Sequence, residues 1–245
     1  KLQQSTTLLQ QDHDEFNGTS GGTYRCVPPS VVASSSPAFA SPLLTSTQLA
    51  TLASERLVVA DDVIDGDVIS GAAEEFRFLH ASRVLQSDGD DLCNPLQCSF
   101  DLPVWNTTTA SHVARDCPML ARLVVHLFTL PKLLETALQL DLRVPQTVML
   151  AAYPPGAHYR RHFDSYGGRD IPRYVTCLLY VGWAPRLGGQ LRAFTRAGVR
   201  EIDPRPGRLC VFFAQEVEHE VLPSSGERFA ITLWIWSKTK DDQGR

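Results

Sequence analysis

The chain has 245 residues, of which 43% are hydrophobic and 20% are charged. This composition is enough for a packed core in one large domain, or one domain with a tail, and it excludes disorder of the whole chain. The formal net charge of −4 at pH 7 argues against nucleic acid as a partner, because general nucleic-acid affinity needs a basic face. No apolar run approaches the roughly 20 residues that cross a bilayer, so no membrane partner is expected.

Two features bear on the compartment. The chain begins at Lys1 rather than Met, so we expect a fragment of a longer chain. Whether a targeting segment precedes it is left open. The six cysteines are scattered, and Cys93 and Cys98 have no second close pair to complete a zinc site. We therefore expect reduced cysteines, with Cys177 and Cys210 as core residues, and a cytoplasmic protein, with the nucleus as the alternative.

The first 45 residues differ in composition from the rest of the chain. They are rich in Gln, Ser, Thr, Gly and Pro and show no sustained period. We therefore expect a flexible N-terminal segment at residues 1–45, with folding that begins near Leu43. The folded domain is assigned to residues 46–245.

Apolar residues recur at helical spacing in the front half of the chain. They predict one helix near residues 69–79, with Asp65 or Asp67 as its N-terminal cap. A second helix is predicted near residues 120–127, and Pro131 either ends it or starts another.

The back half of the chain predicts strands. A short strand at residues 57–59 precedes the helices, and residues 87–103 are expected to form a loop. After Arg143, runs rich in Val, Thr, Ile and aromatic residues alternate with Gly and Pro turns, a pattern typical of a β-sandwich or barrel. We expect an α+β, mainly β fold, with helices that support strands at residues 147–153, 174–181, 190–194, 209–213 and 229–236.

The tripeptide His162-Phe163-Asp164 is a candidate metal site. In an extended segment, residues two apart point to the same side, so the imidazole and the carboxylate converge. His219 is the best third ligand, because it lies between two expected strands. Two histidines and one carboxylate form the facial triad of non-haem Fe(II) oxygenases. The tripeptide alone is weak evidence, since such histidines are more often plain loop or core residues.

Arg228 strengthens the metal hypothesis. It opens the last strand, and alternation puts Arg228, Thr232 and Trp234 on one face and Phe229 and Ile231 on the other. A guanidinium directed into a β-core needs an anion, because a lone buried charge is costly. The far carboxylate of a dicarboxylate bound to the metal would fit, although a surface salt bridge is the alternative for Arg228 alone.

With these residues in place, residues 147–236 resemble the catalytic core of the Fe(II)- and 2-oxoglutarate-dependent prolyl 4-hydroxylases. The likeness is to the cytoplasmic oxygen-sensing branch, which contains the hydroxylases of hypoxia-inducible factor and of the Skp adaptor in ubiquitin ligases. A weaker likeness reaches over residues 58–79 and 105–138. The segments that carry the resemblance are Tyr153-Pro154-Pro155-Gly156, His162-Phe163-Asp164, Arg173-Tyr174-Val175-Thr176-Cys177-Leu178-Leu179-Tyr180, Gly188-Gly189-Gln190-Leu191-Arg192, His219-Glu220-Val221, and Arg228-Phe229-Ala230-Ile231-Thr232-Leu233-Trp234.

The resemblance implies a double-stranded β-helix of the jelly-roll or cupin-like kind, with N-terminal supporting helices. It also implies that residues 46–245 are a catalytic domain that hydroxylates a proline in a cytosolic protein with O₂ and 2-oxoglutarate, with ascorbate as reductant. Fe(II) would be held by His162, Asp164 and His219, and the far carboxylate of 2-oxoglutarate by Arg228 and Tyr180. The implied pocket lining is Tyr153, Leu191, Thr232 and Trp234, with Arg173 near the substrate mouth.

The chain departs from this family in two places. It is one residue shorter than the animal oxygen sensors between Tyr153 and His162, and residues 87–102 show no clear match. Both departures leave the acceptor open, and we favour an Skp-type adaptor over a factor like hypoxia-inducible factor. The alternatives are an oxygenase for another residue or small molecule, a catalytically dead β-barrel, and a secretory hydroxylase with glycosylation triplets at Asn17 and Asn106.

Overall fold

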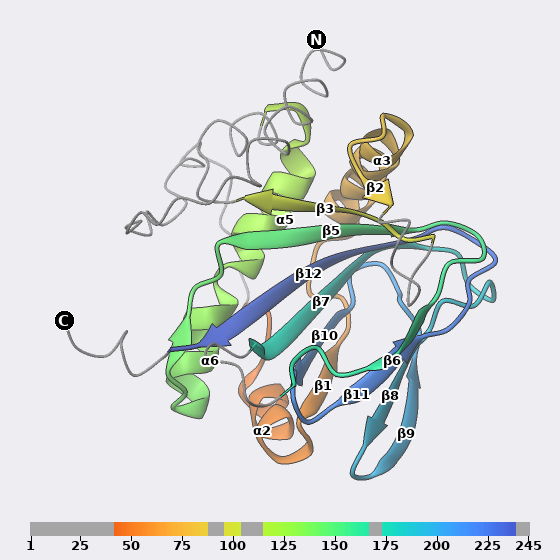
Figure 1. The fold of residues 1–245 in the computed structure, drawn as a ribbon. Helices are drawn as coiled ribbons and strands as arrows, with labels where there is room; N and C mark the ends of the chain where they lie inside the picture. The colour runs from red at the N-terminus through yellow and green to blue at the C-terminus, as the bar shows by residue number, and fades with distance from the viewer. Residues whose placement is uncertain (1–41, 88–95, 104–114, 167–172, 239–245) are drawn as a thin grey trace, which may run out of the picture.

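The computed structural model describes residues 42–87, 96–103, 115–166 and 173–238. Two antiparallel sheets face each other, and the helices lie along the outer side of the larger sheet (Figure 1). The glycosylation triplets at Asn17 and Asn106 lie outside these ranges. So do residues 1–41, and the division of the chain at residue 45 stays a prediction.

In the described ranges, the helices that support the larger sheet are α2 (Ser46–Glu55), α3 (Gly66–Ala81), α5 (Pro118–Leu127) and α6 (Leu130–Leu138). Helix α2 was not predicted, although a capping box starts it: Thr45 Oγ1 accepts from Gln48 N, and Gln48 Oε1 accepts from Thr45 N. The predicted helices α3 and α5 are confirmed. Asp65 occupies the N-cap of α3 but makes no side-chain capping bond. Helix α6 begins at Leu130, so Pro131 starts a new helix.

The larger sheet has the strand order β1-β10-β7-β12-β5-β3-β2, and β4 pairs with β12. The predicted strands β5 and β10 are confirmed with the same bounds. The bounds are β1 (Leu57–Ala60), β2 (Gln86–Ser87), β3 (Cys98–Pro103), β4 (Leu142–Arg143), β5 (Thr147–Tyr153), β7 (Arg173–Trp183), β10 (Leu209–Phe213) and β12 (Arg228–Ser237).

The prediction of a loop at residues 87–103 is wrong at both ends. Strand β3 pairs with β5 over its whole length, from Cys98 opposite Ala152 to Pro103 opposite Thr147. Strand β2 pairs in turn with β3. The alternation of Cys98, Phe100 and Leu102 with polar residues is a short strand signal, but the Asp-, Asn- and Gly-rich run before it and Pro103 after it favour a loop for the segment as a whole. Its strand conformation comes from hydrogen bonds to a partner far away in sequence, which a local pattern does not reveal.

The smaller sheet has the order β6-β11-β8-β9. Its strands are β6 (Tyr159–His162), β8 (Leu191–Thr195), β9 (Gly198–Ile202) and β11 (Glu218–Val221). Only β8 was predicted from the sequence. The other three are short and carry charged residues toward solvent, so they lack the apolar run that identified the buried strands.

The alternation predicted for β12 separates two buried clusters. Phe229 and Ile231 pack with the helices, and the ring of Phe229 stacks on Phe76 of α3 at 5.2 Å between centroids. Ala230 packs on the opposite side, between the two sheets. Two facing antiparallel sheets with supporting helices confirm the expected mainly β, double-stranded β-helix fold.

The prediction that Cys177 and Cys210 are core residues is confirmed. Cys177 and Cys210 are fully buried, and both are free thiols, as are Cys98 and Cys117. Burial raises the pKa of the Cys210 thiol to about 12, so it packs as a small apolar residue. Within the described ranges, every helix is too short or too polar to cross a bilayer.

Candidate active site

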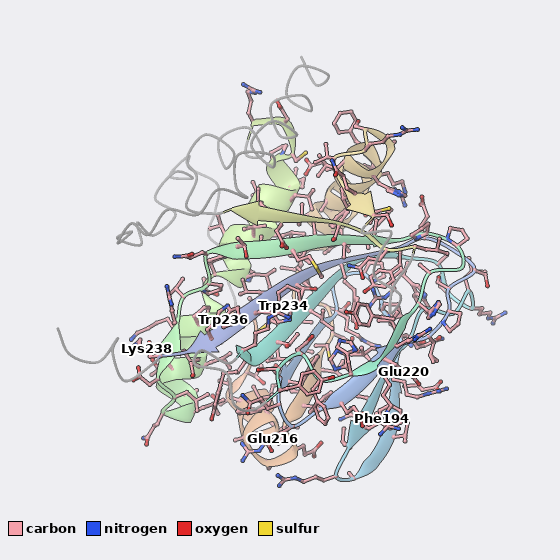
Figure 2. The ribbon with its side chains drawn as sticks, in the orientation of Figure 1. Phe194, Glu216, Glu220, Trp234, Trp236 and Lys238 are labelled. Carbon is pink, nitrogen blue, oxygen red and sulfur yellow. The ribbon has the colours of Figure 1, made fainter. Side chains whose placement is uncertain are left out.

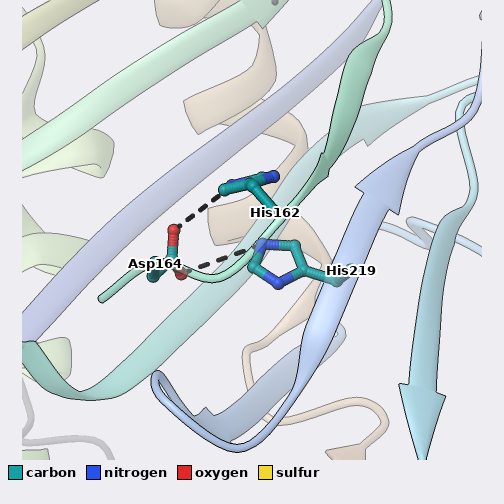
Figure 3. Close-up of side chains that lie close together, drawn as sticks. All are labelled: His162, Asp164 and His219. Atoms are coloured by element: carbon teal, nitrogen blue, oxygen red, sulfur yellow. Dashed lines mark ion pairs between the residues drawn. The ribbon is translucent and has the colours of Figure 1, made fainter. Parts of the chain in front are cut away.

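His162, Asp164 and His219 meet between the two sheets (Figure 3). His162 ends β6 and lies opposite His219 in the β6–β11 pair, with 4.3 Å between ring centroids. Asp164 follows two residues after β6. One ligand atom from each side chain lies within 4.8 Å of the others. The sequence prediction that these three residues converge therefore agrees with the structure, and the cluster has the donor set of a metal site.

The backbone orients both imidazoles. His162 Nδ1 lies 2.7 Å from the carbonyl oxygen of Arg160, and His219 Nδ1 lies 3.1 Å from that of Val217. A carbonyl oxygen only accepts, so each Nδ1 carries the proton and donates it. This leaves both Nε2 atoms, which face Asp164, with a lone pair for a metal ion.

Asp164 is almost completely buried and remains a carboxylate. Burial alone would raise its pKa, but the neighbouring imidazoles of His162 and His219 and a hydrogen bond from Thr176 together lower the pKa to about 2. The Asp164 oxygens lie 3.5 Å from His162 Nε2 and 3.8 Å from His219 Nε2. Burial lowers the pKa of His219 and favours neutral imidazole. An ionised carboxylate beside a neutral imidazole is the form that binds a divalent metal.

A cavity of about 490 Å³ opens beside the three ligands. It is lined by all of the residues predicted for the site except Tyr180. Besides the three candidate metal ligands, the predicted residues that line the cavity are Tyr153, Arg173, Leu191, Arg228, Thr232 and Trp234. Tyr180 is fully buried behind the wall and contacts the site through Arg228.

Arg228 is a buried cation that forms no ion pair with the described residues. Its side chain is 1% exposed, and its guanidinium lies over the rings of Tyr153 at 4.4 Å and Tyr180 at 5.1 Å. Arg228 Nε and Nη1 and Tyr180 Oη have no hydrogen-bond partner within the described part of the chain. Burial raises the pKa of Tyr180, so its hydroxyl keeps its proton. Unpaired buried donors are costly, and a ligand carboxylate would satisfy all of them.

Comparison with known proteins shows which family this arrangement resembles. Residues 148–236 match the family model of the 2OG-Fe(II) oxygenase superfamily. The matched segment is less than half of the chain and is similar in sequence to that superfamily. The matched oxygenase segment begins in β5 and ends in β12, so it contains Arg228 and the three candidate metal ligands His162, Asp164 and His219.

Proteins similar to the oxygenase segment include prolyl hydroxylases, among them human "Prolyl hydroxylase EGLN3", which is 37% identical over 95 residues, or 36% of this chain and 39% of that protein. Human "Egl nine homolog 1" is 39% identical over 95 residues, which make up 36% of this chain and 22% of that protein. The chain thus spans less than a quarter of that relative. A Pseudomonas putida prolyl-4-hydroxylase structure is 27% identical, with a TM-score of 0.61, and the match covers 79% of this chain and 98% of that one. The predicted resemblance to prolyl 4-hydroxylases is confirmed.

A third relative matches in fold. It is a prolyl hydroxylase from Trichoplax adhaerens, solved in complex with a peptide fragment of the oxygen degradation domain of hypoxia inducible factor. The two structures superpose with a TM-score of 0.64 at 22% identity, over 81% of this chain and 90% of that one. The likeness therefore includes the helices outside the matched oxygenase segment.

Arg173 and Trp234 both line the cavity, and Trp236 lies beside Arg173. The Arg173 guanidinium stacks 3.8 Å from the Trp234 ring and lies 5.6 Å from that of Trp236. Figure 2 shows both tryptophans along β12. The indole Nε1 of Trp234 is buried without a hydrogen-bond partner in the described residues. Arg173 thus lines the cavity, and its place near a substrate mouth stays a prediction, while Trp234 offers an unused donor.

Sequence reasoning missed several site residues. Gln97 and Ser99 of β3 line the cavity, and they were missed because β3 was taken for a loop. Thr176 donates a hydrogen bond to Asp164. The alternation along β7, which puts Thr176 on the face of Leu178 and Tyr180, was a signal that could have identified it.

Proposed function

We propose that this protein is an Fe(II)- and 2-oxoglutarate-dependent oxygenase that hydroxylates a proline in a protein substrate. One observation carries the proposal: a buried guanidinium, with no anion beside it in the described part of the chain, lines the same cavity as two imidazoles and a carboxylate. A metal site alone suits many reactions. A metal site with an unpaired arginine behind it suits a metal-chelating dicarboxylate.

His162, Asp164 and His219 would hold the ion. Two neutral imidazoles and one carboxylate match the donor set of non-haem Fe(II) oxygenases, in which the protein fills one face of the coordination sphere. The Nδ1 bonds to backbone carbonyls keep both imidazoles in the metal-binding tautomer.

Arg228 and Tyr180 would bind the far carboxylate of 2-oxoglutarate. The guanidinium supplies charge and two donors, and Tyr180 supplies a hydroxyl that burial keeps protonated. Tyr153, Leu191, Thr232 and Trp234 would form the walls around the cosubstrate and exclude water. With both groups bound, iron supplies the oxidative chemistry: 2-oxoglutarate and O₂ give succinate and CO₂, and one oxygen atom enters a substrate C–H bond.

The acceptor would enter at the mouth formed by Arg173 and the β3 wall. A prolyl acceptor is supported by the 39% identity with Egl nine homolog 1 and by the prolyl-4-hydroxylase structure from P. putida. We favour a cytosolic Skp-type adaptor over a factor like hypoxia-inducible factor, because residues 87–102 depart from the animal sensors. Ascorbate as reductant, a role in oxygen sensing and a cytoplasmic location are part of the same proposal.

A panel of candidate acceptors tests the proposal. Proline-containing peptides from Skp-type adaptors and from hypoxia-inducible factors, with small-molecule acceptors beside them, would be incubated with the protein, Fe(II), 2-oxoglutarate and ascorbate. We expect succinate formation together with a mass increase of one oxygen atom on a proline. Succinate with oxygen on a different residue or on a small molecule would support the same chemistry on another acceptor. Neither signal with any acceptor would support a catalytically dead domain.

A further inference from the structure

The carboxylate of Asp164 has one strong anchor besides the two histidines. Thr176 Oγ1 donates a hydrogen bond of 2.6 Å to Asp164 Oδ2. Asp164 Oδ1 lies 3.5 Å from His162 Nε2, and Oδ2 lies 3.8 Å from His219 Nε2. Asp164 lies beyond the end of β6, so no strand pairing holds its backbone. Its side-chain contacts therefore decide how the carboxylate is oriented.

Thr176, by contrast, is fixed by the fold. It lies in β7, which pairs on one side with β10 and on the other with β12. Its register partners are Phe212 and Trp234. The residue is 1% exposed, so the hydroxyl has no water as an alternative partner. The Thr176 hydroxyl is therefore held rigidly within the sheet and can fix the orientation of the Asp164 carboxylate, which lies outside the sheet.

We propose that Thr176 is a positioning residue for the metal ligand Asp164. Its hydroxyl engages Oδ2, which fixes the rotation of the carboxylate and leaves Oδ1, on the side of His162, as the single oxygen offered to the ion. This inference rests on the proposed function, because it needs a metal at His162, Asp164 and His219.

The hydrogen bond has two consequences for the metal centre. The carboxylate is oriented before the ion arrives, so less side-chain freedom is lost on binding. With Oδ2 occupied, Asp164 contributes one oxygen rather than two. The positions that 2-oxoglutarate and O₂ need then stay open.

The test measures metal binding rather than turnover. Co(II) is titrated into the metal-free full chain, and its visible d–d absorption reports both affinity and coordination. We expect Thr176→Val to weaken Co(II) binding by about 10- to 100-fold and to shift the absorption band, as removal of hydrogen bonds to metal ligands does elsewhere. Thr176→Ser keeps the hydroxyl and should restore both the affinity and the band.

Two further variants separate positioning from packing. Thr176→Ala differs from Thr176→Ser only by the hydroxyl oxygen. This pair therefore measures the effect of the hydroxyl on Co(II) binding even where the valine variant does not fold. Cys177→Ala alters the next residue of β7, which is fully buried on the opposite face. We expect this control to lower the melting temperature but to leave the Co(II) affinity and spectrum unchanged.

The possible failures are distinguishable. Wild-type affinity and spectrum in both Thr176→Val and Thr176→Ala would overturn the positioning role while leaving the proposed function intact. Equal losses in Thr176→Ser and Thr176→Ala would overturn it too, because the hydroxyl would then make no difference. A wild-type protein whose Co(II) spectrum does not depend on His162 would instead overturn the proposed function.

Discussion

His162 and His219 are register partners across the β6–β11 pair, and their rings lie 4.3 Å apart. A single pair of antiparallel strands therefore sets the spacing of two candidate metal ligands that are far apart in sequence. Asp164 joins them because it follows His162 by two residues and is held from β7 by Thr176. The metal site is thus a product of strand register, and Arg228 reaches the same cavity from the larger sheet.

Loss of one imidazole should remove the metal. We predict that His162→Ala abolishes stoichiometric Fe(II) or Co(II) binding and all 2-oxoglutarate turnover while the chain stays folded, because His162 lies at the end of an edge strand. Isothermal titration with Co(II) and circular dichroism measure the two effects. His158→Ala is the matched control, since His158 precedes the same strand and does not line the cavity. An equal loss in the control would contradict the assignment.

Loss of the guanidinium should weaken cosubstrate binding. A charge-assisted hydrogen bond contributes about 1.5–3 kcal/mol. We therefore predict that Arg228→Ala raises the dissociation constant for 2-oxoglutarate by at least about tenfold, at unchanged metal affinity. Arg228→Lys should recover part of the affinity, because it keeps the charge but not the fork of donors. Arg200→Ala, on the exposed strand β9, serves as control. Equal 2-oxoglutarate affinity in all of these proteins would contradict the role.

The same arginine should lower the stability of the ligand-free protein. Its charge is buried without an anion in the described structure, which is unfavourable. We predict that Arg228→Met has a melting temperature at or above the wild-type value without ligand. We further predict that added Fe(II) and 2-oxoglutarate raise the melting temperature of the wild type much more than that of the variant. A strongly destabilised ligand-free variant would show that another group neutralises Arg228.

Gly188 is expected to tolerate no side chain. It has a φ of +77°, and an added Cβ would lie 2.2 Å from the carbonyl oxygen of Pro223. Backbone strain of this kind alone costs about 1–3 kcal/mol, and the clash adds to it. We predict that Gly188→Ala strongly lowers the free energy of unfolding measured in urea. Gly66→Ala, where a Cβ meets nothing within 4 Å, should leave it nearly unchanged. Similar losses in both variants would refute the steric argument.

The pair of Arg208 and Asp61 should make stability depend on pH. Arg208, which directly precedes β10, donates from Nη2 to Asp61 Oδ2 at 2.9 Å, and this bond lowers the pKa of Asp61. The unfolded chain therefore takes up a proton at higher pH than the native one. The stabilisation is fully present above the ordinary value of 3.8 and is lost as pH falls through the lower native pKa. Asp61 is half exposed, so we expect only about 0.5–1 kcal/mol at neutral pH.

Urea unfolding of wild type and Asp61→Asn at several pH values checks this sign. We predict that the variant is less stable at pH 7 and that the difference shrinks as the pH falls below 3.8. A difference that grows toward acid pH would contradict the linkage.

The sequence predicted best what depends on local patterns. Alternation in β12 placed Arg228 and Phe229 on opposite faces, and the spacing of His162 and Asp164 indicated two ligands. The missed elements depend on distant partners. Strand β3 forms because β5 lies beside it, and the edge strands β6 and β9 carry charges toward solvent. The packing of Tyr180 behind Arg228, rather than on the cavity wall, also follows only from three-dimensional structure.

Anaerobic titration with Fe(II) and 2-oxoglutarate tests the central claim most directly, because chelation of the keto acid by Fe(II) gives a visible charge-transfer band. We predict this band in the wild type and its absence in His162→Ala. In Arg228→Ala the band should reach half its intensity only at a 2-oxoglutarate concentration at least about tenfold higher. A wild-type protein without the band, or a band of equal intensity in His162→Ala, would contradict the account.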